Sequence, residues 1–103
     1  MTVEQAQTVL SQMGGIGKLT AMVGAKDFMR GNNPDGTPFV SFKFKGCKGC
    51  NFMRITLAAD DTYTVAFGKI AGFDFKTGPV YEGTYADRLI PTFEQHTGLY
   101  LRF

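Results

Sequence analysis

Three consecutive runs of alternating apolar and polar residues constrain the fold of this chain more than any other feature. They span residues 39–45, 51–57 and 62–68, and only short turns separate them. A period of two is typical of strands that are buried on one face, and close spacing favours antiparallel neighbours. The sequence therefore predicts an antiparallel meander whose buried face carries Val40, Phe42, Phe44, Ile55, Leu57, Val65 and Phe67.

Helical patterns flank these runs on both sides. Thr2 begins a Thr-x-x-Gln capping box, and apolar residues at three- and four-residue spacing follow it, which predicts a helix over 3–13. A second helix is predicted from Thr84, as its cap, to Gly98, and Pro91 is expected to kink or split it. We therefore expect a single α+β domain over residues 1–103: an antiparallel sheet of three to five strands with helices near the N- and C-termini packed on one face.

Several shorter segments carry patterns of their own. Residues 18–24 alternate and predict a further strand, while the turn formers of 31–38 predict an exposed loop. Gly72 is expected to break or bulge a strand continuing over 69–75, and residues 76–79 are predicted to form a turn.

Composition limits the class of protein and of partner. Hydrophobic residues make up 44% and charged residues 19%, which is typical of a globular domain. No apolar stretch is long enough to cross a bilayer and the first residues lack a signal-peptide pattern, so we expect no membrane partner and a cytoplasmic location. The net charge of +2 argues against a dedicated duplex-DNA binder, which is usually far more basic.

The outward face of the predicted meander combines basic and aromatic residues. Between Phe39 and Arg54 there are four basic residues and no acidic one. Charge for phosphates and flat rings for bases are what single-stranded nucleic acid requires. An ordinary solvated face, on which lysines prevent pairing of sheet edges, stays open as the alternative. The candidate nucleic-acid-binding residues are Phe39, Lys43, Lys45, Lys48, Phe52 and Arg54.

The other chemistry-bearing residues indicate no active site. Cys47 and Cys50 have the spacing of half a zinc site, but the chain holds no second half, so a metal would have to be shared between two chains. A redox pair would be expected at a helix N-terminus rather than in a turn, and two ordinary cysteines are the favoured interpretation. His96, in the last turn of the second helix, is expected to interact as a cation with the helix C-terminus. We predict no catalytic residue, no metal site and no cofactor, and we expect no enzyme.

Three segments together resemble a widespread group of small phage and prophage proteins. They are LSQMGGIGKLTAMVGAKDF (10–28), ITLAADDTYTVAFGKIAGFD (55–74) and YADRLIPTFEQHTGLYLRF (85–103). The chain departs from the pattern of the group at Pro91 and in the cysteine-bearing turn. The resemblance implies a phage setting, hence the cytoplasm of a host cell, and no particular chemistry.

These observations lead to two functional hypotheses. The first is a non-enzymatic, phage-type accessory protein that binds nucleic acid or a nucleic-acid-processing complex. The second is a protein–protein interaction module, such as an inhibitor of a host defence enzyme, or a homodimer. Leu99, Tyr100 and Phe103 motivate the second, because exposed apolar residues in an edge strand or a packed tail would favour a partner.

Overall fold

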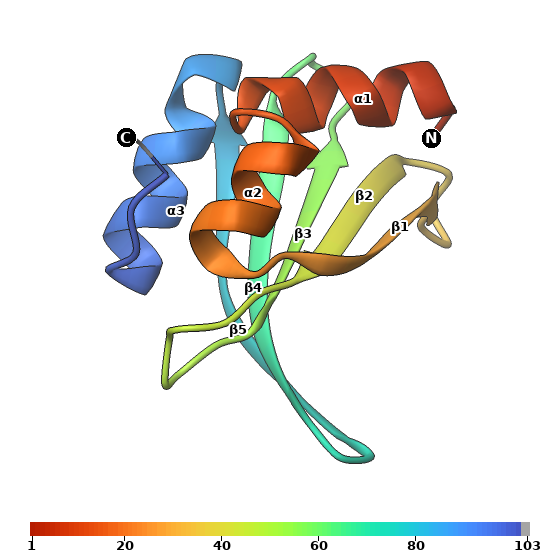
Figure 1. Cartoon of the computed structure of the whole chain (residues 1–103). Coiled ribbons are helices and arrows are strands. Elements are labelled where there is room, and N and C mark those ends of the chain that lie inside the picture. Colours follow the sequence, from red (N-terminus) through yellow and green to blue (C-terminus); the bar gives the residue numbers. More distant parts are fainter. Residues whose placement is uncertain (102–103) are drawn as a thin grey trace.

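A computed structural model, which describes residues 1–101, contains one antiparallel sheet of five strands (Figure 1). The strands lie side by side in the order in which they occur in the chain. In chain order the elements are α1 (Val3–Gln12), α2 (Ile16–Val23), β1 (Lys26–Asn32), β2 (Pro38–Lys43), β3 (Phe52–Leu57), β4 (Tyr63–Ala71), β5 (Asp74–Thr84), the short 3₁₀ helix η1 (Ala86–Arg88) and α3 (Leu89–Thr97).

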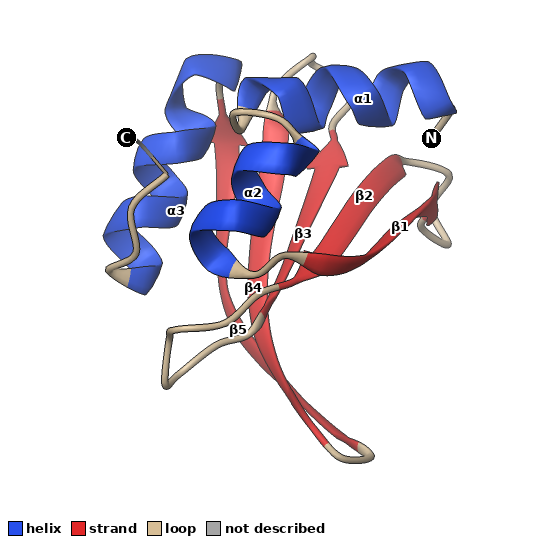
Figure 2. Ribbon diagram, in the orientation of Figure 1, coloured by secondary structure: helices blue, strands red, loops and turns tan. Residues whose placement is uncertain are grey.

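The helices lie on one side of the sheet, which confirms the α+β arrangement (Figure 2). The inward-facing residues expected from alternation are all buried except Leu57, which is partly buried. Met13 at the end of α1, Leu19 from α2 and Phe93 from α3 fill the space between the two layers without any exposed surface. We refer to the opposite side of the sheet, which no helix in residues 1–101 covers, as the open face.

The first helix forms as its capping box predicts. The Thr2 hydroxyl accepts a hydrogen bond from the Gln5 backbone N–H at 3.1 Å, and the Thr2 N–H donates to the Gln5 side chain at 3.0 Å. Two of the free N–H groups at the helix start are thereby satisfied. Ala6, Val9 and Leu10 form the buried stripe of this helix.

The prediction of a strand over residues 18–24 is wrong, because this segment forms most of α2. Leu19 and Val23 are four residues apart and both are buried, so the same residues that alternate also satisfy a helical period. Gly15, at φ +93°, starts the helix, and Gly24, in the left-handed region at φ +63°, ends it. Glycine adopts both conformations without the steric cost that other residues would incur.

The prediction of a turn at residues 76–79 is also wrong. The strand β4 continues to Ala71, which pairs with Asp74, and β5 runs through the whole segment as an edge strand. Gly72, at φ +62°, is therefore the first turn residue of a tight hairpin rather than a bulge. Bulges in β5 accommodate the turn formers, and the hairpin extends well beyond the rest of the sheet (Figure 1).

The second predicted helix is split, as the sequence allowed, but the division lies before Pro91 rather than at it. A 3₁₀ turn precedes α3, and Pro91 is the third residue of α3, where a missing N–H costs no intrahelical hydrogen bond. Thr84 does not cap this helix. It ends β5, and its hydroxyl donates to the Tyr81 carbonyl at 3.2 Å.

The sequence patterns did not predict β1. This strand shortens the loop expected at 31–38 to the turn between Asn32 and Pro38.

The end of the chain is packed against the rest of the domain. Beyond α3 the chain forms a packed tail, in which Leu101 is buried and its N–H donates to the Glu94 carboxylate at 3.0 Å. Phe103 lies outside the described residues. None of the helices in residues 1–101 has the length and apolarity that crossing a bilayer requires.

Candidate nucleic-acid interface

Strand register defines which side chains share the open face. Residues directly opposite each other in neighbouring strands point to the same side of a sheet. One row across all five strands consists of Met29, Ser41, Arg54, Ala66 and Val80. The next row consists of Lys43, Phe52, Gly68 and Thr77, and Phe39 lies on the other side of the Arg54 row. The predicted residues Phe39, Lys43, Phe52 and Arg54 therefore do come together.

Arg54 lies at the centre of this face, on the middle strand. Its guanidinium carbon lies 4.4 Å from the centroid of the Phe39 ring and 5.8 Å from that of Phe52. One Nη donates to the side-chain oxygen of Asn33 at 3.3 Å. A guanidinium held in this way between two rings forms a flat, positively charged platform.

Phe75 belongs to the same surface, and the sequence interpretation missed it. Its ring meets that of Phe52 edge to face, with centroids 5.5 Å apart, and remains about half exposed. Gly68 makes this position possible, because a Cβ there would lie 2.8 Å from the Phe75 ring. The signal was present in the sequence: if Gly72 is taken as a hairpin turn, Phe75 falls opposite Ile70 and on the outward side.

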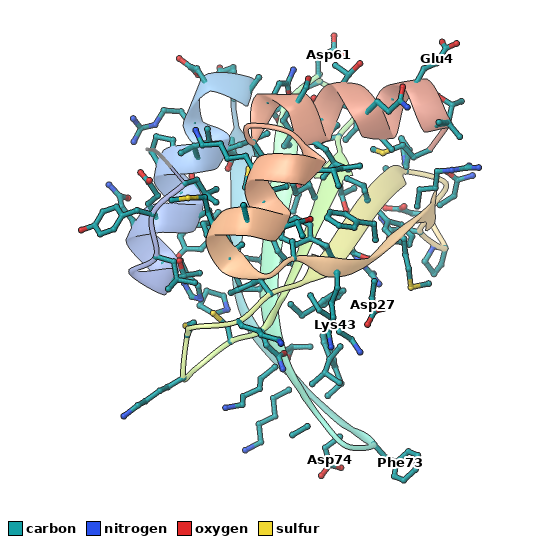
Figure 3. All side chains as sticks on the ribbon, viewed as in Figure 1. Glu4, Asp27, Lys43, Asp61, Phe73 and Asp74 are labelled. Carbon is teal, nitrogen blue, oxygen red and sulfur yellow. The ribbon has the colours of Figure 1, made fainter. Side chains whose placement is uncertain are left out.

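Lys43 is held at one side of this surface by an ion pair. Its Nζ lies 3.5 Å from the Asp27 carboxylate, and both side chains remain substantially exposed (Figure 3). They line a shallow depression of about 430 Å³ that continues to Met29, Phe52 and Ile70. Because the pair is exposed, it contributes little stability, and Lys43 can exchange Asp27 for another anion at little cost.

Two of the predicted residues lie elsewhere. The chain leaves the sheet after Lys43, so Lys45 does not continue the alternation; its backbone N–H donates to Val23 and its stem lies against Gly24, beside the end of α2. Lys48 lies in the connection between β2 and β3, and its carbonyl accepts a hydrogen bond from Lys69 Nζ. Within residues 1–101, Lys43 and Arg54 are thus the basic members of the predicted set on the open face.

His96 does not have the environment expected for a cation at a helix end. Its ring stacks on Phe67, with centroids 4.1 Å apart, and its Nδ1 shares a hydrogen bond with the Tyr81 hydroxyl at 3.0 Å. Burial lowers the pKa of His96 below its ordinary value of 6.5. The neutral imidazole is therefore the form that the folded protein favours at neutral pH.

This lowered pKa gives a pH dependence to stability. The unfolded chain binds more protons than the folded one between the ordinary histidine pKa and the lower folded value, so the free energy of unfolding should fall as pH drops through that window. Urea unfolding at about pH 7.5 and about pH 5.5 brackets the ordinary value. His96→Gln, which cannot be protonated, should show a smaller decrease than the wild type. An equal decrease in both proteins would contradict the assignment.

Within residues 1–101, no three His, Cys, Asp or Glu side chains come close enough together to hold an ion. Cys47 and Cys50 are free thiols in the turn after β2.

No family model matches the chain, and comparison with curated proteins and with solved structures gave no match either.

Proposed function

We propose that this protein is a non-enzymatic accessory factor, of the phage type, that binds single-stranded nucleic acid on the open face of its sheet. The observation that carries the proposal is the arrangement of Phe39, Phe52 and Phe75 around Arg54 on a sheet surface that no helix covers. Aromatic rings on an open antiparallel sheet, with a guanidinium between them, offer stacking surfaces to successive bases.

The shape of this surface favours a single strand over a duplex. Phe39, Phe52 and Arg54 lie on the inner strands β2 and β3 of the sheet rather than on a protruding helix or ribbon that could enter a major groove. Their flat faces can reach bases only when the bases are unpaired. Met29 and Val80, which are 63% and 55% exposed, extend the apolar part of the surface toward both edges of the sheet.

The charge on the open face indicates moderate, salt-dependent affinity. Lys43 and Arg54 are positioned to meet phosphates, and the ion pair of Lys43 with Asp27 would open when a phosphate replaces the carboxylate. Each phosphate that a basic side chain neutralises contributes a slope of about −0.7 to the plot of log affinity against log salt for a single strand. Engagement of both residues therefore predicts a slope of about −1.4.

Fluorescence anisotropy with labelled oligonucleotides tests the proposal. Single-stranded and duplex probes of equal length should be titrated with the full chain at several salt concentrations. The expected result is tighter binding of the single strand, with affinity that falls as salt rises. Failure of both probes to bind below about 100 μM at low salt, a level within ordinary non-specific affinity, would overturn it.

A protein–protein interaction module is the second candidate. Phe73, at the tip of the hairpin, has its whole side chain exposed and points away from the domain (Figure 3). An exposed apolar ring on a projecting hairpin suits insertion into a partner protein. If the oligonucleotides fail to bind, and light scattering shows a concentration-dependent rise in mass that Phe73→Ser abolishes, this second function is favoured.

A further inference from the structure

A second depression lies on the helix side of the sheet, away from the open face. The turn that joins β2 to β3, the base of the β4–β5 hairpin and the end of α3 enclose it, and these three segments lie near one another in Figure 1. It has a volume of about 610 Å³. Its walls include Cys47, Cys50, Lys69, Lys76 and His96.

The two sulfur atoms in this depression lie close together and differ in exposure. Cys50 Sγ donates a hydrogen bond to Cys47 Sγ at 3.0 Å. Cys50 is 2% exposed, whereas Cys47 is only partly buried and lies nearer to solvent. A bond between the two sulfurs requires a shift of about 1 Å from this separation. Gly49, whose missing Cβ faces open space, lies between them in the turn.

The surroundings of the two thiols assign them different reactivities. Burial acts to raise the pKa of Cys47, but hydrogen bonds from the Cys50 thiol and from the backbone N–H groups of Gly49 and Cys50, with the Lys69 ammonium, outweigh it and lower the pKa below its ordinary value. Burial, the hydrogen bond to Cys47 and the charge of its thiolate raise the pKa of Cys50 to about 12. Cys47 is therefore the more readily ionised of the two thiols and the one expected to act as the nucleophile.

The wall of the depression carries positive charge. Lys69 and Lys76 are directly opposite each other in β4 and β5, and the Lys69 ammonium reaches the cysteine turn, where it donates to the Lys48 carbonyl. Like charges in this position destabilise a sheet unless an anion lies between them. No Asp or Glu is among the residues that line the depression in the described part of the chain.

We propose that Cys47 and Cys50 form a thiol–disulfide exchange site for the disulfide of a small anionic thiol, of the glutathione class. The Cys47 thiolate attacks one sulfur of that disulfide, a mixed disulfide forms on Cys47, and the first small thiolate leaves and takes up a proton. Cys50 then loses its proton and attacks Cys47 Sγ, which closes the Cys47–Cys50 bond and releases the second small thiol. The protein dithiol loses two electrons and two protons, and the small disulfide gains them to become two thiols.

The order of these steps follows from the electrostatics. Formation of the mixed disulfide removes the negative charge of Cys47, which is one of the causes that hold the Cys50 proton in place. Cys50 therefore becomes easier to deprotonate only after Cys47 has reacted. Lys69 and Lys76 both line the depression and attract the carboxylates of the incoming disulfide, and the Lys69 ammonium also acts on the attacking sulfur.

Intact-mass analysis of the full chain after incubation with oxidised glutathione at neutral pH tests the assignment. The wild type should end as an internal disulfide, lighter by two hydrogen atoms, whereas Cys50→Ser or Cys50→Ala should stop at a glutathione adduct on Cys47. Cys47→Ser should react at least about tenfold more slowly, because the remaining Cys50 thiol is buried and burial, the largest cause of its raised pKa, persists in this variant. Equal rates for the two single-cysteine proteins, or a wild type that stays a dithiol, would overturn the proposal.

A second experiment tests whether the site prefers an anionic disulfide. Lys76→Gln should slow the reaction with oxidised glutathione by about fivefold and leave the reaction with cystamine, a cationic disulfide, no slower. Lys26→Gln, which removes a lysine that does not line the depression, should change neither rate. If the wild type reacts equally fast with the anionic and the cationic disulfide, the anionic assignment is wrong.

Discussion

Replacing Phe52 with leucine is expected to weaken binding of a single-stranded oligonucleotide by about fivefold to a hundredfold. Leucine keeps most of the apolar volume on β3 but has no flat face, and stacking of a base on an aromatic side chain contributes about 1–3 kcal/mol. Phe52 is the position to change because its ring lies between Arg54 and Phe75, at the middle of the proposed surface. Anisotropy titrations at constant salt measure the loss.

Two matched variants separate stacking from general damage. Phe52→Tyr retains the ring and should bind within about twofold of the wild type, since every base can stack on a tyrosine. Tyr100→Leu removes a ring that is 67% exposed in the tail beyond α3, outside the strands of the sheet, and should leave binding unchanged. Equal weakening by Phe52→Leu and Tyr100→Leu, or none from Phe52→Leu, would contradict the stacking surface.

Truncating Phe93 to alanine is expected to destabilise the domain by about 3–5 kcal/mol. The Phe93 side chain has no exposed surface, and its ring lies 5.1 Å from that of Phe44 and 6.4 Å from that of Phe67. It is thus, with Leu89, one of the two fully buried apolar side chains of α3. A domain of this size has a total stability of about 5–15 kcal/mol, so the loss should be visible as a large shift of the urea midpoint.

Phe73→Ala is the natural control for this measurement. It deletes the same ring from the hairpin tip, where the side chain is fully exposed, and should change the free energy of unfolding by less than about 0.5 kcal/mol. If the two alanine variants were equally stable, the packing of α3 described above would be incorrect. If Phe73→Ala were the more destabilised of the two, the hairpin tip would have to be buried.

The parts of the fold that the sequence predicted are those in which one local pattern acts alone. The alternation over 39–45 and 62–68 identified the core face because the large apolar side chains of both strands lie on one side and are buried there. For residues 18–24 the same reasoning predicted the wrong element, since Leu19 and Val23 fit a strand and a helix equally well. The flanking glycines decide in favour of the helix, because Gly15 and Gly24 supply the start and the left-handed end that a short helix needs.

The surface on the open face was only partly accessible from the sequence, because it depends on contacts between distant segments. Phe39, Phe52 and Arg54 could be grouped from the alternation of β2 and β3. Phe75 could not be placed until the hairpin turn at Gly72 fixed the register of β5. Lys45 was misplaced because alternation assumes that the strand continues, whereas the chain turns toward α2 immediately after Lys43.

The irregular edges of the sheet affect how this protein can meet copies of itself. At one edge, β5 contains Pro79, which has no N–H to donate, and its register shifts twice against β4. At the other edge, β1 has a register shift between Lys26 and Met29, where Asp27 adopts a positive φ. Neither edge therefore offers the straight ladder of donors and acceptors that fibrous assembly or strand exchange requires. A homodimer of this chain would have to form through its faces or its hairpin tip, and a concentrated solution should resist edge-to-edge aggregation.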